Sequence, residues 1–152
     1  KPLIELWIVP NNTELAFSLN AQEIIDQFER ATPPLEKRIK ALNQMLAAWW
    51  KVGLRLMPLI PIAWYLEIYE RFFQQLKSQI DIDRCSSIFF GWFLLTTNDL
   101  KQMQKKSPDS ALRPLLQSDV WVLVRTGEQE RRELYDLIRQ YFPGAQVSMD
   151  EM

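Results

Sequence analysis

The residues best suited to bind an anion are basic side chains within one long predicted helix. At about 100° per residue they fall within about 60° of one another on the helical wheel. They are Lys37, Lys40, Lys51 and Arg55. Four cations on one face can contact phosphate groups, an acidic lipid surface or an acidic partner. The same pattern is typical of the solvated side of an amphipathic helix, which is the interpretation we favour.

Tryptophan is unusually frequent, with six residues in a chain of 152. Adjacent Trp49 and Trp50 cannot both point into one narrow core seam, because neighbours on a helix lie about 100° apart. Trp64 lies at the margin of a second predicted apolar helix face. Large aromatic side chains are usually buried, but exposed ones serve as anchors for protein partners. The sequence therefore predicts an aromatic protein-binding surface formed by Trp49, Trp50 and Trp64.

Few other side chains are spaced for chemistry. Asp81 and Asp83 would lie on the same side of an extended segment, but two carboxylates are too few for a cation site and Arg84 offsets their charge. Cys85 heads a Cys-Ser-Ser run with no base to activate a thiol or a hydroxyl. We therefore expect a structural role for these residues and no metal site.

Histidine is absent from the chain, which excludes several classes of enzyme. Its absence removes the Ser-His-Asp and Cys-His mechanisms and the usual imidazole metal ligand. The four glycines are too dispersed for a phosphate-binding loop. We expect no catalytic residue and no cofactor in this sequence. A carboxylate or metal-dependent enzyme stays as an alternative, because carboxylates can converge from distant segments.

Length and composition predict a single domain over residues 1–152, since 47% hydrophobic content can form a core without disulfides. The net charge of −1 gives no general reason to expect a nucleic acid partner. The single cysteine favours the cytoplasm. The longest apolar stretch, Val52 to Leu66, contains Arg55 and two prolines, so we expect no transmembrane segment.

The first half of the chain predicts one strand and three helices. The strand covers Leu3 to Val9, and a short helix follows, with Asn20 and Glu23 as its capping box. Two long helices, from Leu35 to Met57 and from Pro61 to Gln79, would form an αα-hairpin.

The second half predicts alternating strands and helices. Apolar residues from Ser87 to Thr96 indicate a buried strand, and a short helix follows toward Lys106. A strand from Asp119 to Arg125 then leads into a helix capped by Thr126, and Ala145 to Met149 would form a last strand. These three elements make a β-α-β unit.

Together these elements indicate an α+β or α/β fold. Its small mixed sheet of three to four strands would pack against the αα-hairpin, with the C-terminal β-α-β unit added. The function that we favour is a non-catalytic protein-interaction domain: an assembly factor, a regulatory module or a subunit of a larger complex. Its partner would be another protein or a second copy of the chain. The alternative is binding of nucleic acid or an anionic surface through the basic helix face.

Overall fold

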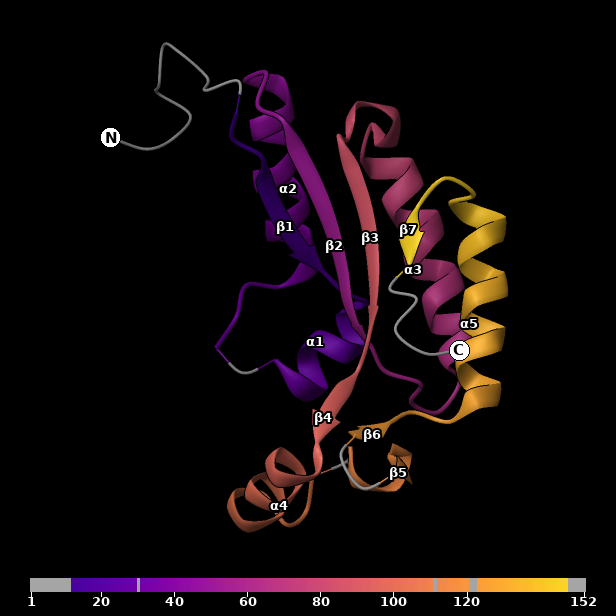
Figure 1. Ribbon diagram of the computed structural model, residues 1–152. Coiled ribbons are helices and arrows are strands. Elements are labelled where there is room, and N and C mark those ends of the chain that lie inside the picture. Colours follow the sequence, from indigo (N-terminus) through magenta and orange to yellow (C-terminus); the bar gives the residue numbers. More distant parts are fainter. Residues whose placement is uncertain (1–11, 30, 111, 121–122, 148–152) are drawn as a thin grey trace.

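The computed structural model describes residues 12–29, 31–110, 112–120 and 123–147. Two sheets organise this part of the chain (Figure 1). The larger has four parallel strands in the order β1-β2-β3-β7, and the smaller has three antiparallel strands in the order β4-β6-β5. The expected mixed α/β fold class is therefore confirmed.

The larger sheet and the helices around it use segments from the whole chain. In chain order they are β1 (Leu15–Leu19), α1 (Gln22–Phe28), α2 (Leu35–Ala47), β2 (Val52–Leu59), α3 (Tyr65–Gln79), β3 (Ser87–Trp92), α5 (Glu128–Tyr141) and β7 (Gln146–Val147). The smaller sheet and its helix follow β3. They are β4 (Leu94–Thr96), α4 (Thr97–Lys106), β5 (Gln117–Val120) and β6 (Leu123–Arg125).

The core lies on one face of the larger sheet, between its strands and the helices α2, α3 and α5. Side chains alternate between the two faces of a strand, so Val52, Leu54 and Leu56 of β2 all point to the helix side, where each is at most 1% exposed. Phe73 of α3 meets Phe90 of β3 edge to face, with ring centroids 5.6 Å apart. Figure 1 shows α2 and α3 behind the strands. Burial of these side chains is the main force that fixes the helices on this face.

The prediction of an αα-hairpin is wrong. The first of its helices ends at Ala47, and residues Val52–Leu59 form the strand β2 between α2 and α3. A buried parallel strand has a nearly continuous apolar sequence, which periodicity alone does not distinguish from a buried helix. The hairpin therefore becomes an α-β-α succession, in which β2 pairs with both β1 and β3.

Other predicted elements are confirmed in part. The strand expected at Leu3 to Val9 lies outside the described residues, and β1 was not predicted. The segment from Ser87 to Thr96 forms β3 and β4, which belong to different sheets. The single strand expected from Asp119 to Arg125 is instead the pair β5 and β6.

The C-terminal β-α-β unit is also different from the expectation, because β6 and β7 lie in different sheets. Neither predicted capping box forms. Ala21 and Gly127 are the N-caps of α1 and α5, and neither makes a side-chain cap. The Thr126 hydroxyl is buried without a hydrogen-bond partner in the described part of the chain.

Candidate functional site

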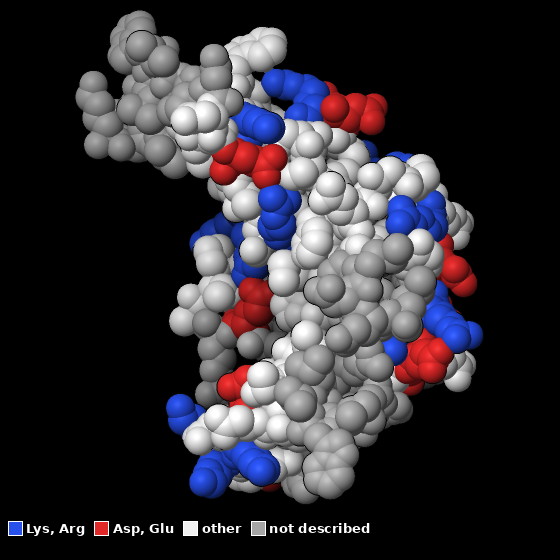
Figure 2. Space-filling view, viewed as in Figure 1, with Lys and Arg blue, Asp and Glu red and all other residues white. Residues whose placement is uncertain are grey.

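The second face of the parallel sheet carries no helix in the described residues. The register of the strands aligns the side chains that point to this face. They are Ala16 and Ser18 of β1, Gly53, Arg55 and Met57 of β2, Ser87, Phe89 and Gly91 of β3, and Gln146 of β7. We call this set the open face, and Figure 2 views it directly. Parallel sheets are normally covered on both sides, so an open face is a candidate ligand surface.

The amino half of the open face is held together by a polar cluster. Arg55 Nη2 donates to Glu14 Oε1 at 2.7 Å, and Arg55 Nη1 donates to Ser87 Oγ at 2.9 Å. Ser86 Oγ donates to Glu14 Oε2 at 2.5 Å. A Cβ atom on Gly53 would lie 2.6 Å from both Glu14 Oε1 and Ser87 Oγ, so only glycine leaves room for these contacts. These groups satisfy one another's hydrogen-bonding capacity, so the cluster stabilises the contact between the strands.

The pKa of the Glu14 carboxyl is lowered in this cluster. The largest cause is the hydrogen bond from Ser86, and the hydrogen bonds from Arg55 and Ser87 act in the same direction, against the effect of burial. Each of these contacts favours the carboxylate over the neutral acid. Glu14 therefore stays ionised and paired, and is unsuited to act as a proton donor.

On β2 and β3 the carboxyl half of the open face is apolar. Met57 is 41% exposed. Phe89 is half-buried, yet it belongs neither to the core nor to the side chains packed against it. Between them lies Gly91, where an added Cβ would come 3.1 Å from Met57 Cβ and 3.3 Å from Phe89 Cε1. This half offers a hydrophobic floor with no charged group, suited to contact a planar ring.

The carboxyl ends of β1 and β2 are joined by a buried amide. Asn20 is 1% exposed. Its Nδ2 donates to the Pro58 carbonyl oxygen at 2.8 Å, and its Oδ1 accepts from the Ala21 backbone at 3.0 Å. In parallel α/β folds, ligands bind beyond the carboxyl ends of the strands. Asn20 therefore fixes the edge at which such a ligand would sit.

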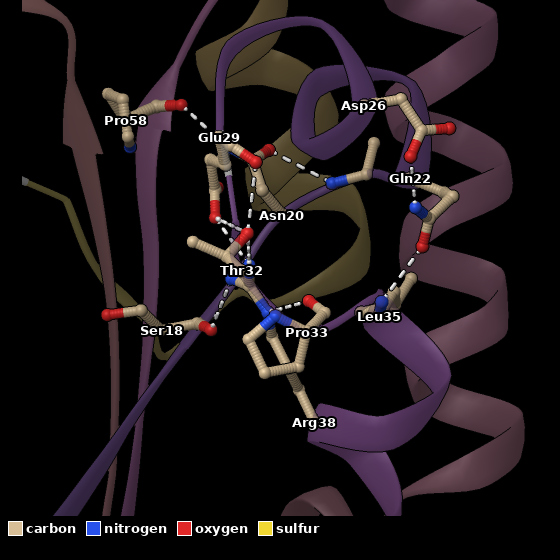
Figure 3. A network of polar contacts seen from close by, with 11 residues as sticks. Ser18, Asn20, Gln22, Asp26, Glu29, Thr32, Pro33, Leu35, Arg38 and Pro58 are labelled. Atoms are coloured by element: carbon tan, nitrogen blue, oxygen red, sulfur yellow. Dashed lines mark hydrogen bonds and ion pairs between the residues drawn. The ribbon is translucent and has the colours of Figure 1, made fainter.

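A second polar network holds the connection between α1 and α2 beside this edge (Figure 3). The Arg38 side chain is only 12% exposed. Its guanidinium donates to the Pro33 carbonyl at 2.7 Å, to the Ser18 carbonyl at 3.2 Å and to Glu29 Oε2 at 2.5 Å. Arg38 thus ties the loop to the end of β1 and positions α1 at the carboxyl edge of the sheet.

The predicted basic stripe does not exist as one surface. Lys37 and Lys40 are exposed on α2, and Lys51 is exposed just before β2. Arg55 lies on the open face, opposite to the side that α2 covers, where it pairs with Glu14. The stripe required one helix through all four positions, and that helix ends at Ala47.

The predicted aromatic surface is also dispersed. Trp50 is 5% exposed and belongs to the core, whereas Trp49 and Trp64 are 82% and 78% exposed. The guanidinium of Arg84 lies 5.2 Å from the ring centroid of Trp49. Trp49 precedes β2 and Trp64 follows it, so the length of an eight-residue strand, roughly 25 Å, separates them. They cannot form one patch.

The structure places the weaker chemical candidates Asp81, Asp83 and Cys85 in the lining of one cleft, beside Lys77 and Tyr141. Asp81 and Asp83 are exposed beside a short 3₁₀ turn, and the described residues contain no group of three potential metal ligands. Burial raises the pKa of the Cys85 thiol to about 11, outweighing the effect of Arg84. No helix in the described ranges combines the length and the apolar character needed to cross a bilayer.

Sequence reasoning missed most of the residues that shape the open face and its edge. Glu14 precedes an unpredicted strand, and Asn20 was assigned to a helix cap. Gly53 was placed on a helix face, because the apolar residues around it also fit a helical stripe. Arg38 bonds to the loop just before its own helix, whose course the sequence pattern does not reveal. Phe89 lies in a continuous apolar run, which does not show which side of the sheet each residue faces.

Comparisons with known proteins match this architecture. Residues 9–114 match the spore photoproduct lyase family. The chain is 32% identical to spore photoproduct lyase of Bacillus subtilis (strain 168) over 78 residues, which are 51% of this chain and 23% of that protein.

Solved structures agree in fold. Spore photoproduct lyase complexed with dinucleoside spore photoproduct has a TM-score of 0.70 at 24% identity, covering 89% of this chain and 44% of that one. A variant of the enzyme with bound AdoMet and dinucleoside spore photoproduct also gives 0.70, at 23% identity and the same coverage. The chain therefore spans less than half the length of these solved relatives.

The family match corrects the expected function. A lyase is an enzyme, so the non-catalytic interaction domain, whether assembly factor, regulatory module or subunit, is wrong. That expectation rested on the absence of catalytic residues, and a chain that spans under half of its solved relatives can lack residues that the family as a whole has. Since the match covers well over half of its residues, this chain belongs to the spore photoproduct lyase family.

Proposed function

We propose that this chain supplies a lesion-binding surface of a DNA repair lyase, and that the carboxyl half of the open face receives the dinucleoside photoproduct. The observation that carries the proposal is the open face itself. The family match covers β1, β2 and β3, whose side chains make up nearly all of this face. Solved relatives of the same fold are described with dinucleoside spore photoproduct bound.

The chemistry of the floor supports this ligand. A photoproduct of two nucleosides presents planar, mostly apolar base surfaces once it leaves the stacked helix, and proteins contact such bases with aromatic and apolar side chains. Met57 and Phe89 provide these contacts, and Gly91 between them lets the two side chains close over the backbone into one apolar surface. The neighbouring Arg55 is neutralised by Glu14, so no charge is left facing an uncharged base.

The residues described here do not by themselves fit AdoMet. This ligand requires partners for a carboxylate, an ammonium group, ribose hydroxyls and an adenine. On the open face, Arg55 already donates to Glu14, Ser87 and the Leu54 carbonyl. At the edge, Asn20 has both ends of its amide engaged. An AdoMet site would therefore need residues beyond the described set.

A DNA repair role would also keep the protein with DNA in the cytoplasm, where a single cysteine stays reduced. Nucleic acid is then a partner despite the net charge of −1. The binding surface would be local. In the polar half of the open face Arg55 and Glu14 neutralise each other, which leaves the apolar half to contact the ligand.

Titration of the 152-residue chain with dinucleoside spore photoproduct, followed by tryptophan fluorescence and calorimetry, tests the proposal. We expect saturable binding that is weakened roughly 5- to 150-fold by Phe89→Ala, since stacking on one aromatic ring contributes about 1–3 kcal/mol. The same dinucleoside without the photoproduct linkage should bind more weakly.

Trp49→Ala is the matched control, because it removes another large aromatic side chain, which is exposed at the opposite end of β2. Its affinity should equal that of the parent chain. If the parent chain does not bind the photoproduct, or if Phe89→Ala and Trp49→Ala reduce affinity equally, the open face is not the lesion site.

A further inference from the structure

We infer that the exposed face of α4 contacts the phosphate backbone of DNA beside the lesion. This inference rests on the proposed function, since it assumes that DNA is the substrate. The face consists of Asn98, Lys101, Gln102, Lys105 and Lys106, all of which are exposed. None of the other features of the described structure, including the large cleft beside Cys85, brings several unpaired cations to the ligand-binding edge of the sheet.

The composition of α4 fits a phosphate-binding surface. Its ten residues bury no side chain completely, and three of them are lysines. On a helical wheel the five residues of the exposed face fall within about 140°, with Lys101 and Lys106 at its two edges and Lys105 nearer its centre. Lysines and amide side chains are the groups that most often donate to phosphate oxygens.

The acidic residue of α4 does not neutralise these lysines. Asp99 lies in the first turn, where its Oδ2 accepts a hydrogen bond from the Thr96 hydroxyl at 2.6 Å. Its backbone N–H in turn donates to Thr96 Oγ1 at 3.1 Å, which completes the N-cap. None of the three lysines forms an ion pair with a described residue. The last two turns of α4 therefore present positive charge alone.

Its position distinguishes α4 from the basic residues Lys37 and Lys40 of α2. The chain leaves the carboxyl end of β3 through β4 directly into α4, which packs on β4 and β6 (Figure 1). Figure 2 shows basic side chains gathered at this end of the molecule, beyond the apolar half of the open face. The lysines of α2 lie instead on the helix-covered side, where Glu36 precedes Lys40 by four residues.

The salt dependence of DNA affinity tests this inference, because each phosphate contact releases counterions from the DNA. Each phosphate contact adds about 0.9 to the slope of log K against log salt for duplex DNA. We would measure the affinity of the 152-residue chain for a short lesion-containing duplex by fluorescence anisotropy at several salt concentrations. Replacing Lys101, Lys105 and Lys106 by Gln should reduce the slope by roughly 2 to 3 and the affinity in 0.1 M salt by about tenfold or more.

The matched control replaces Lys37, Lys40 and Lys51 by Gln, which changes the net charge by the same amount at positions outside α4. Its slope should equal that of the parent chain. Circular dichroism melting should show both variants folded, because all six lysines are exposed.

The two proposals fail in different ways. A dinucleoside lacks a phosphate backbone on either side, so the α4 variant should bind the free photoproduct as the parent chain does. Loss of photoproduct binding in the parent chain would contradict the proposed function. Equal slopes in the two triple variants, or no duplex binding by the parent chain at low salt, would overturn the assignment of α4.

Discussion

The guanidinium of Arg55 and the carboxylate of Glu14 form an ion pair with a 2.7 Å contact, which joins the segment before β1 to the middle of β2. The Glu14 side chain is 24% exposed and that of Arg55 is 29% exposed, so the pair is only partly screened by water. Two adjacent serines complete the shell around the carboxylate. The pair closes the polar half of the open face.

Replacing Glu14 by Gln should lower the stability of the protein at neutral pH and make its stability less sensitive to acid. The pKa of Glu14 is lowered in the folded protein, so its contribution is present above the unfolded value of 4.5 and is lost as pH falls through the folded value. We expect a loss of about 1 kcal/mol at pH 7, or roughly 2 to 4 °C in Tm. Melting curves from pH 7 to pH 3 should converge for the two proteins. A difference that stays constant down to pH 3 would contradict this role.

Gly53→Ala should disrupt the same cluster by steric overlap. The new methyl group would lie 2.6 Å from oxygen atoms of Glu14 and Ser87, and overpacking of this kind costs about 1–3 kcal/mol. Gly144→Ala is the control, because no atom lies within 4 Å of the added Cβ. Urea unfolding should show the loss in the first variant alone. Equal stability of the two variants would mean that the cluster relaxes freely.

Asn20→Ala should destabilise the carboxyl edge. It removes the donor to the Pro58 carbonyl and the acceptor for the Ala21 N–H, leaving buried polar groups without partners. Such a loss costs about 1–3 kcal/mol. Gln22→Ala, which removes the acceptor for the Leu35 N–H in a more exposed setting, should cost less. Thermal denaturation of both variants tests the order, and the reverse order would show that the edge is not fixed by Asn20.

Cys85 should react slowly with thiol reagents in the folded protein. Its pKa of about 11, raised mainly by burial, leaves almost no thiolate at pH 8. Iodoacetamide labelling followed by mass spectrometry should be much slower in buffer than in urea, where an ordinary thiol pKa returns. Equally fast labelling in both conditions would place the thiol in a more solvated setting than the structure has.

Sequence patterns predicted elements well where amphipathic periodicity was clear. The apolar stripe beginning at Tyr65 identified α3, and that of α5 was equally plain. β2 was misassigned, because its residues Gly53, Leu56 and Met57 also continue the apolar stripe of the preceding helix. This helical fit hid the alternation of Val52, Leu54 and Leu56.

The candidate site was harder to predict from the sequence than the fold. The ion pair between Glu14 and Arg55 spans a long stretch of chain, and only the pairing of β1 with β2 brings its members together. The prediction that Lys51 and Lys37 share one helix face failed because the helix ends at Ala47. Lys51 lies beyond this end, just before β2. Side chains that act together across a sheet have no fixed spacing in sequence.

The parallel arrangement of the larger sheet also has a kinetic consequence. Leu15 pairs with Val52, Gly53 with Ser87 and Phe89 with Gln146, so every ladder joins segments that are dozens of residues apart. Each pairing closes a long loop before any strand contact forms, and chains rich in such distant contacts fold in milliseconds to seconds. A refolding experiment should therefore detect the helices well before the sheet is complete.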